Sequence, residues 1–211
     1  MIIAVDGPTA SGKGTISKAL AAHYSLPFLD TGLLYRAVGR QVALNGGNAD
    51  VATDALAACG FPGALLDDPI LRNEVVGGLA SRVSVHPEVR AALNQRQVDF
   101  ANQHGGAVLD GRDIGTVIAP HADVKLFVTA SAEVRARRRY DEMLSRGLHV
   151  DFENILADIK ARDERDSNRA TAPLKPAADA ILLDTGDMTI GAAVRRAIEL
   201  VDAGIENRSA K

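Results

Sequence analysis

The chain has 211 residues, a length typical of one domain or of one domain with an inserted subdomain. Hydrophobic residues make up 46% of the chain and aromatic residues 4%, so the composition predicts a sizeable core with mainly aliphatic packing. The net charge of -3 excludes an overall basic, nucleic-acid-binding composition, and the single cysteine, Cys59, excludes an intramolecular disulfide framework.

No apolar run approaches the length that a bilayer-spanning helix needs. The N-terminal residues lead directly into a glycine-rich loop, which leaves no room for a signal peptide. A lone cysteine also fits a reducing compartment. We therefore expect a cytoplasmic protein without a membrane partner.

Residues 1–20 read as a strand, a glycine-rich turn and a helix. Residues 2–5 are apolar and rich in β-branched side chains, and helical spacing of apolar residues begins after the turn. Such a turn points backbone N–H groups and a helix N-terminus at a phosphate, and Lys13 can reach the outer phosphates. The predicted ATP-binding residues are Gly7, Pro8, Thr9, Ala10, Ser11, Gly12, Lys13, Gly14 and Thr15.

The order Gly-Lys-Gly-Thr departs from the strict phosphate-loop pattern, in which Ser or Thr directly follows the lysine. Gly14 intervenes here, and the hydroxyl group arrives at Thr15. This variant resembles nucleoside monophosphate kinases more than GTPases or motor ATPases. The alternative is a glycine-rich turn with a surface lysine, which the preceding strand and the following helix make unattractive.

The rest of the chain alternates between helical patterns and short apolar runs. An apolar run at 27–29 precedes a helical pattern through Leu44, for which Asp30 or Thr31 is a natural N-cap. Further helices are predicted at residues 49–58, 71–85, 87–103, 133–145, 152–168 and 190–203, and strands at 108–109, 124–128 and 180–183. Residues 206–211 are polar and are expected to fray. The alternation predicts an α/β fold, a parallel sheet flanked by helices on both faces.

Asp110 closes one of these apolar strands. In phosphate-loop proteins a carboxylate at this place holds Mg²⁺, directly or through water, together with the loop hydroxyl, here that of Thr15. An aspartate at a strand end more often serves a turn or a cap. Beside a phosphate loop, we favour the metal site.

The helix that follows Asp30 begins with Thr31, and Tyr35 and Arg36 lie one turn further on. A hydroxyl and free N–H groups at a helix N-terminus, backed by an arginine, form a second anion site. An ordinary capped helix with a surface arginine explains the same residues equally well.

Two arginine-rich stretches each admit more than one interpretation. Arg162, Asp166 and Arg169 share a helical face, which fits either a clamp for a phosphate and a sugar hydroxyl or a solvated salt-bridge ladder. Spacing alone favours the ladder. In the run at 135–139, Arg135, Arg138 and Arg139 share a helical face. This run fits a lid over ATP phosphates, a solvated helix face or a nucleic-acid patch, and the acidic total weakens the last of these.

Several motifs then occur in a specific order: Asp6-Gly7-Pro8, Asp30-Thr31-Gly32-Leu33-Leu34-Tyr35-Arg36, Asp110-Gly111-Arg112-Asp113-Ile114-Gly115-Thr116-Val117, Arg162-Asp163-Glu164-Arg165-Asp166, Asn168-Arg169 and Pro176-Ala177-Ala178-Asp179. On these residues the chain resembles bacterial cytidylate kinases along nearly its whole length. The resemblance implies a P-loop kinase fold in one domain over 1–211, with a monophosphate-binding segment at about 31–105 and a lid at about 133–170. It also implies Mg²⁺-dependent phosphorylation of CMP and dCMP by ATP in pyrimidine metabolism.

The same resemblance assigns roles to individual residues. The arginines that match CMP-phosphate ligands are Arg36, Arg112 and Arg169, and the residues that match cytosine readers are Ser81, Arg90 and Asp113. Thr31, Arg162 and Asp166 match positions near the sugar and phosphate, and Arg138 and Arg139 match lid arginines on the ATP side. The candidate catalytic residues are Lys13, Arg112, Arg138, Arg139 and Arg169.

The segment at 61–68 departs from the family, because many bacterial members carry a longer insertion with short antiparallel strands there. The shape of the monophosphate-binding segment is therefore open. Other small-acceptor kinases, acting on dephospho-coenzyme A, shikimate or AMP, are the nearest enzymatic alternatives. A nucleotide-dependent switch or nucleic-acid-binding module is the alternative from another class. We expect a monomer with ATP and CMP or dCMP as its only partners.

Overall fold

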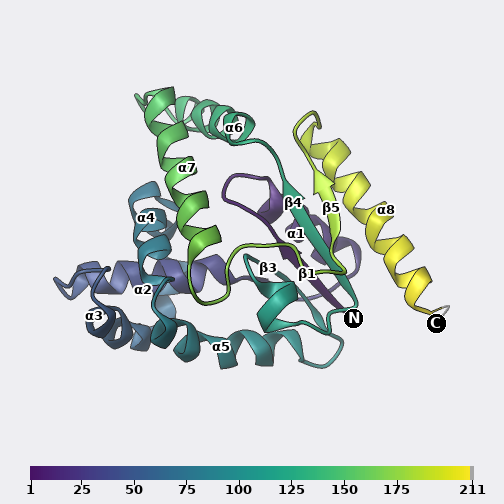
Figure 1. Ribbon diagram of the computed structural model, residues 1–211, viewed down its shortest axis with the longest axis horizontal. Coiled ribbons are helices and arrows are strands. Elements are labelled where there is room, and N and C mark those ends of the chain that lie inside the picture. The colour runs from purple at the N-terminus through teal and green to yellow at the C-terminus, as the bar shows by residue number, and fades with distance from the viewer. Residues whose placement is uncertain (210–211) are drawn as a thin grey trace.

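Five parallel strands form the centre of the computed structural model, which describes residues 1–209 (Figure 1). Their spatial order is β2-β3-β1-β4-β5. The strands are β1 (Ile2–Asp6), β2 (Phe28–Asp30), β3 (Ala107–Gly111), β4 (Val124–Thr129) and β5 (Ile181–Asp184). The predicted α/β fold with a parallel sheet is confirmed, and the apolar run at 27–29 proves to be the start of an edge strand.

Within residues 1–209, the α-helices agree with the predicted stretches in number and order. They are α1 (Lys13–His23), α2 (Thr31–Leu44), α3 (Ala52–Ala57), α4 (Glu74–Val83), α5 (Pro87–Ala101), α6 (Ala132–Ser145), α7 (Phe152–Asn168) and α8 (Ile190–Ser209). Several boundaries differ from expectation; α3, for example, begins at Ala52 rather than at residue 49. The helix predicted from residue 71 begins at Glu74, because Asn73 caps it by accepting the N–H of Val75. α8 continues through most of the tail expected to fray, of which residues 210 and 211 lie outside the described chain.

Two apolar layers cover the sheet. β1 lies at its middle, where Ile3, Ala4 and Val5 are fully buried, as expected for a parallel strand enclosed on both faces. Ile3 and Val5 belong to one cluster with α1 and α8, whereas Ala4 belongs to another with α5 and the π-helical turn η4 (Ile114–Ile118). The alternation of side chains along the strand explains this division.

The chain between β2 and β3 holds helices and connecting loops, and no strand occurs in these described residues. Three short 3-10 turns, η1 (Ala58–Gly60), η2 (Gly63–Asp67) and η3 (Pro69–Arg72), connect α3 to α4. This segment has its own apolar cluster, centred on the packing of α2 against α4. Gly39 permits that packing, since a Cβ atom there would lie 2.8 Å from Cβ of Leu79.

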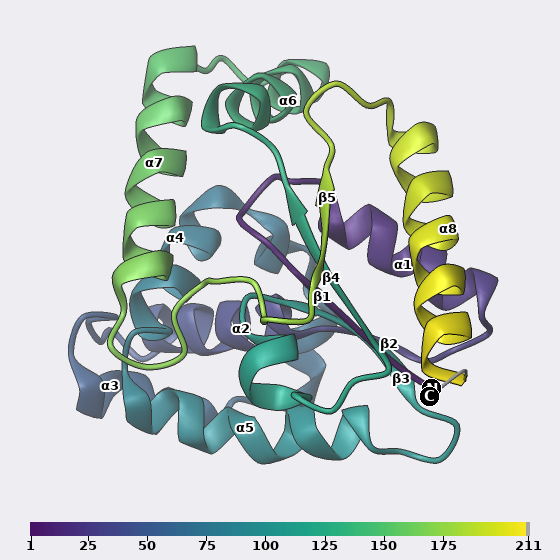
Figure 2. The same ribbon diagram turned by 45° about the vertical axis from the view of Figure 1, so that its right-hand side comes forward.

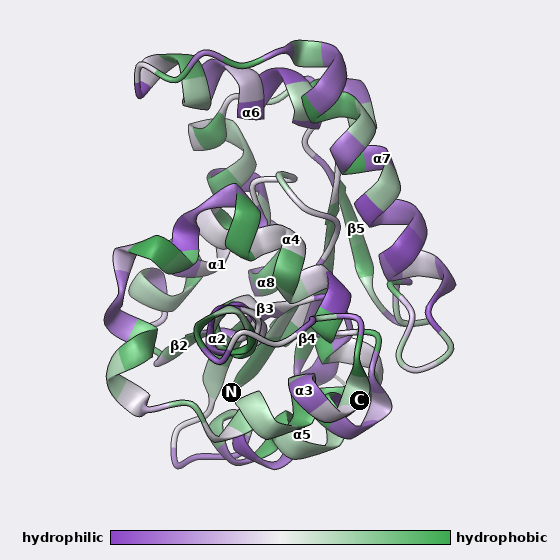
Figure 3. Cartoon of the chain, turned by 90° about the vertical axis from the view of Figure 1, so that its left-hand side faces the viewer, coloured by the Kyte–Doolittle hydropathy of each residue, from purple (hydrophilic) through white to green (hydrophobic). Residues whose placement is uncertain are grey.

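The carboxyl ends of the strands face the side of the molecule where α6 and α7 stand (Figure 2). Figure 3 shows largely apolar strands at the centre and many hydrophilic residues along α7. No helix within residues 1–209 is long and apolar enough to cross a membrane. The parallel topology therefore collects the loops after β1, β2 and β3 under the two arginine-rich helices.

Candidate active site

A cavity of about 780 Å³ opens at the carboxyl ends of the strands. Its lining comes from the phosphate loop, the helical segment between β2 and β3, the β3 end, and α6 and α7. Of the sequence-predicted site residues it includes Thr9, Ala10, Gly12, Lys13, Gly14, Thr15, Thr31, Tyr35, Arg36, Ser81, Arg90, Asp110, Arg112, Asp113, Arg138, Arg139, Arg162, Asp166 and Arg169. Gly7, Pro8 and Ser11 belong to the loop but do not line this cavity.

The loop after β1 has the tight backbone that its glycines predicted. Gly7 has φ of 153°, and a Cβ atom there would lie 2.1 Å from the carbonyl oxygen of Val128. Gly12 has φ of 87° and directly precedes α1, which places the helix N-terminus at the cavity. Only glycine satisfies both positions without strain. The loop is therefore shaped for close approach of a phosphate group.

Lys13 and Asp110 form a buried pair at the floor of the cavity. Nζ of Lys13 lies 3.8 Å from Oδ1 of Asp110 and 3.4 Å from the carbonyl oxygen of Pro8. Burial lowers the pKa of Lys13 to about 8 and raises the pKa of Asp110 to about 6. Oδ1 of Asp110 has no hydrogen-bond partner within the described chain. A buried carboxylate oxygen without a donor, beside Thr15 on the same cavity, fits a divalent cation.

The N-terminus of α2 agrees only in part with the two interpretations offered for it, an anion site and an ordinary capped helix with a surface arginine. Asp30 is the N-cap, but its side chain accepts no capping bond from the described residues, and the Thr31 hydroxyl donates to the carbonyl of Asp110 at 2.8 Å. Arg36 is partly buried rather than free on the surface, donating to the carbonyls of Leu71 and Asn73 at 2.7 and 2.9 Å.

Gly77 makes room for this arginine. A Cβ atom on Gly77 would lie 2.9 Å from Nη2 of Arg36. Gly77 of α4 thus admits a guanidinium group toward the cavity.

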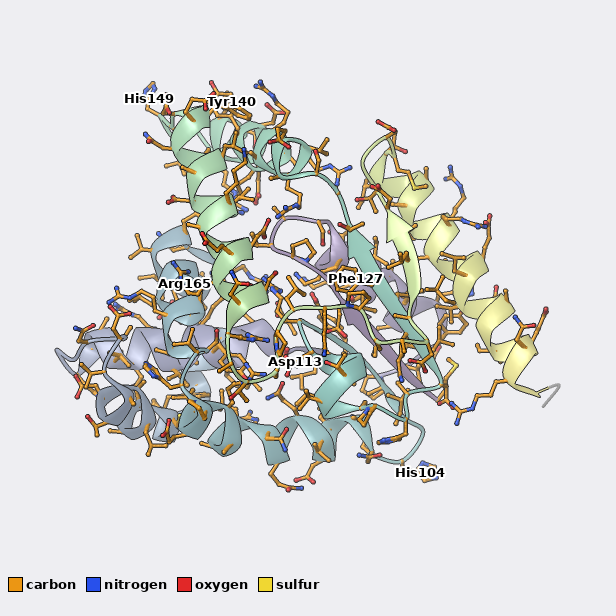
Figure 4. All side chains as sticks on the ribbon, viewed as in Figure 1. His104, Asp113, Phe127, Tyr140, His149 and Arg165 are labelled. Atoms are coloured by element: carbon orange, nitrogen blue, oxygen red, sulfur yellow. The ribbon has the colours of Figure 1, made fainter. Side chains whose placement is uncertain are left out.

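Asp113 lies between two buried arginines. Its carboxylate pairs with Arg90 and, at 3.5 Å, with Nη2 of Arg169. The guanidinium of Arg90 also stacks over the Tyr35 ring, 5.5 Å from its centroid. Figure 4 labels Asp113 near the centre of the molecule, where α7, the β3 end and α5 meet. Asp113, Arg90 and Arg169, which we call the Asp113 cluster, all line the cavity.

Asp166 connects β3, α4 and α7. It accepts Nε of Arg112 at 3.0 Å and the Ser81 hydroxyl at 3.4 Å. Burial acts to raise the pKa of Asp166, but Arg112, Arg169 and Arg162 outweigh it and hold the pKa below the usual value. Arg162 is itself buried, and burial lowers its pKa to about 10.

This burial argues against a solvated salt-bridge ladder on α7, which spacing alone had favoured. Asp166 is 5% exposed and Arg169 is 8% exposed. The predicted shared helical face is also only partly correct, because Arg169 caps the C-terminus of α7 in an extended conformation. From there it turns back and donates to the carbonyl of Ala172 at 2.6 Å.

The arginine run on α6 divides among three surroundings. Arg138 donates to Oγ1 of Thr185 at 3.0 Å, and Arg139 pairs with Glu74 and, at 2.7 Å, with Glu142. Arg137 stacks over Tyr140 and Phe152, on the outer side of the helix pair. A uniform solvated face is therefore excluded, and only Arg138 and Arg139 line the cavity.

Arg135 is 4% exposed and does not line the cavity, although the spacing placed it beside Arg138 and Arg139. It donates to the carbonyl of Thr9 at 3.2 Å and pairs with Asp163 on α7 at 2.5 Å. It thus ties the phosphate loop to the helix that carries Arg162.

The predicted set lacked several charged residues in or beside the cavity, and Arg165 and Glu74 are two of them. Arg165 donates from α7 to the Ser81 hydroxyl at 2.7 Å (Figure 4), and Glu74 receives Arg139 at the edge of the cavity. Arg165 lies in the same charged motif as Asp166, which is the signal that could have found it. Glu74 gives no such signal, since its partner is distant in the sequence.

Comparison with known proteins then decides the family. The family model described as cytidylate kinase matches residues 3–203. The chain belongs to the cytidylate kinase family. It is 56% identical to the cytidylate kinase of Xanthobacter autotrophicus over 96% of this chain and 98% of that protein. It is 55% identical to that of Rhodopseudomonas palustris, covering 96% of each chain.

Among solved structures, an uncharacterized protein from Eubacterium ventriosum is similar in fold. The superposition has a TM-score of 0.54 at 17% identity and covers 96% of this chain and 99% of that chain. At this identity the similarity concerns the fold alone.

Proposed function

We propose that this protein transfers the γ-phosphoryl group of ATP to CMP or dCMP, giving ADP and CDP or dCDP. The observation that carries the proposal is that one cavity is lined by the phosphate loop, the Asp113 cluster and a group of arginines. A phosphate oxygen of the monophosphate attacks the γ-phosphorus, and the bond to the ADP oxygen breaks. Because that acceptor is already an oxyanion, the reaction needs positioning and charge stabilisation rather than a strong base.

On the ATP side, we assign the cradle to residues 7–15. We propose that the divalent cation is Mg²⁺. Thr15 and Asp110 would hold it, and it would neutralise charge on the β- and γ-phosphates. Lys13, buried at the loop end, is positioned to follow the transferring group. Arg138 and Arg139 would close over the phosphates from the lid.

On the monophosphate side, we assign the phosphate to Arg36, Arg112 and Arg169. Arg162 and Asp166 lie beside them, where a sugar hydroxyl can pair with the carboxylate. The base would enter toward the Asp113 cluster with Ser81. Residues 31–105 are the proposed monophosphate-binding segment and residues 133–170 the proposed lid, whose closure would exclude water as an acceptor.

Base choice follows from the chemistry of that cluster. Cytosine presents an amino donor at C4, which a carboxylate can accept, and an N3 acceptor, to which Arg90 can donate. Uracil would present a carbonyl oxygen to the same carboxylate, leaving two acceptors face to face. A buried polar site discriminates strongly against such a mismatch.

A panel of substrates tests the proposal. Mg-ATP should phosphorylate CMP and dCMP faster than AMP, UMP, GMP, shikimate or dephospho-coenzyme A, as measured by ADP release. Faster turnover of any other acceptor than of both cytidine nucleotides would overturn the assignment. An alcohol acceptor would also require a carboxylate base, whereas the carboxylates Asp113 and Asp166 are paired with arginines.

We further propose that the enzyme acts as a monomer in the cytoplasm, without nucleic acid or membrane as a partner. The single free cysteine, Cys59, supports a reducing compartment. The net charge of -3 and the pairing of Arg135 and Arg139 with acidic side chains support the absence of a nucleic-acid surface.

A further inference from the structure

Asp6, the last residue of β1, makes a contact that the catalytic scheme does not use. Its side chain is buried, with 4% of the residue exposed. Oδ1 accepts the backbone N–H of Ile114 at 2.8 Å, and Oδ2 accepts that of Gly115 at 2.8 Å. Both donors belong to the first residues of η4, the turn that begins directly after Asp113.

Asp113 is the N-cap residue of that turn, and aspartate is among the residues preferred at an N-cap. Its side chain nevertheless makes no capping bond within the described chain. The carboxylate points instead to Arg90 and Arg169. One of these two N–H groups, that of Gly115, is a group that an N-cap aspartate would serve, and Asp6 takes it from a different strand.

We propose that Asp6 is a positioning residue for base selection. By capping η4 in place of Asp113, it leaves the Asp113 carboxylate free to face the arginines and the base. This inference rests on the proposed function, since it gives Asp113 the role of cytosine reader.

The physical basis is competition for one carboxylate. Ile114 is fully buried, and Gly115 is also buried, so their N–H groups cannot turn to bulk water. Without Asp6, the Gly115 N–H would need another acceptor, and Asp113, two residues before it, could serve it only by turning back onto η4. That rotation would break the pairs with Arg90 and Arg169 and remove the acceptor from the base.

The surroundings hold Asp6 in this role. In the sheet, Asp6 pairs with Gly111 of β3 and with Phe127 of β4, so its backbone is fixed on both sides. Gly115 approaches closely, since a Cβ atom there would lie 3.1 Å from Cδ of Lys125 and 3.4 Å from Oδ2 of Asp6. The segment from Gly111 to Gly115 is thus anchored at both ends, with Arg112 and Asp113 between the anchors.

The test uses Asp6→Asn, which keeps the side-chain volume but can accept only one of the two N–H bonds. Rates are measured at pH 7.5, above the pKa of about 7 that burial gives Asp6 and below the pKa of about 8 of Lys13. We expect kcat/KM for CMP to fall by about tenfold and that for UMP to fall less, with the KM for ATP changed by less than about twofold. An unchanged CMP-to-UMP ratio in a folded variant would overturn the proposal.

A variant that carries both Asp6→Asn and Asp113→Asn shows whether Asp6 acts on base selection through Asp113. In an Asp113→Asn background, Asp6→Asn should not narrow the CMP-to-UMP ratio further, because the two residues act through one carboxylate. An equal, additional narrowing would mean that Asp6 acts elsewhere and would also overturn the proposal.

Amide hydrogen exchange supplies a readout that does not depend on activity or on the folding of the Asp6 variant. In Asp113→Asn, protection of the Ile114 and Gly115 amides should change by the same factor, within about threefold, as that of the buried β1 amides, because the variant loses global stability but Asp113 does not cap η4. A selective loss of protection at Ile114 and Gly115 would refute the inference. Failure of the wild type to phosphorylate CMP would instead refute the proposed function and leave this exchange result to decide the role of Asp6.

Discussion

Replacing Asp113 with Asn removes a negative charge from between two guanidinium groups while keeping the side-chain volume. The side chains of Asp113 and Arg90 are each 8% exposed, and that of Arg169 is 3% exposed. Solvent screening is therefore weak. Breaking a buried ion pair typically costs 3–5 kcal/mol, and because Asn retains one acceptor oxygen we expect about 3 kcal/mol. For a chain of this length, that lowers Tm by about 6–12 °C.

The catalytic consequence is separate from the loss of stability. A charge-assisted hydrogen bond is worth about 1.5–3 kcal/mol, which is about 10- to 150-fold in kcat/KM for CMP. UMP should lose less, because the Asn amide can turn its NH₂ group toward the uracil carbonyl. The CMP-to-UMP ratio should therefore narrow, mainly through the CMP value.

The assay compares initial rates for both nucleotides at saturating Mg-ATP, together with a thermal melt. Asp163→Asn is the matched control, since it weakens the pair with buried Arg135 but lies outside the cavity. It should lower Tm without changing the CMP-to-UMP ratio. An equal fall of kcat/KM for CMP and UMP in Asp113→Asn would show that Asp113 only pairs with arginines, and the reasoning on base choice would be refuted.

Other predictions follow from single contacts of the cavity. Lys13→Ala should lower kcat by about 10²-fold or more with an unchanged CD spectrum, and near-normal turnover would remove the phosphate-loop assignment. Glu74→Gln should lower the KM for ATP by up to about fivefold, because the partly exposed pair between Glu74 and Arg139, worth at most about 1 kcal/mol, is lost. A raised KM for ATP would contradict this expectation. Weak binding of single-stranded RNA at physiological salt should not change in Arg138→Ala/Arg139→Ala, whereas tight, salt-dependent binding lost in that variant would restore the nucleic-acid interpretation.

Local patterns determined most of the secondary structure and the chemical type of the site. The spacing of Gly7, Gly12 and Lys13 after an apolar run is sufficient to predict a phosphate loop, because backbone conformation and side-chain reach there depend on neighbouring residues alone. Alternation of apolar runs and helical stretches likewise predicted a parallel sheet. β2 was seen only as an apolar run, because three residues are too few for a pattern and pairing with β3 makes them a strand.

Side-chain partners were decided by the tertiary structure alone. Helical spacing grouped Arg135 with Arg138 and Arg139, but the packing of α7 on α6 and the bond from Arg135 to Thr9 of the phosphate loop hold Arg135 buried away from the cavity. The same spacing favoured a solvated ladder on α7, although Asp166 is buried against Arg112. Periodicity states which residues share a face, whereas the element that covers this face comes from distant parts of the chain.

Asp6 shows most clearly that local sequence does not reveal a side chain's partner. Its sequence neighbours identify it only as the residue before the phosphate loop, yet its carboxylate holds two N–H groups at 114 and 115. The sheet register, which sets β1 beside β3, brings them together. A hydrogen bond across more than a hundred residues leaves no trace in local periodicity, so only the folded structure could assign Asp6 to η4 and free Asp113 for the cavity.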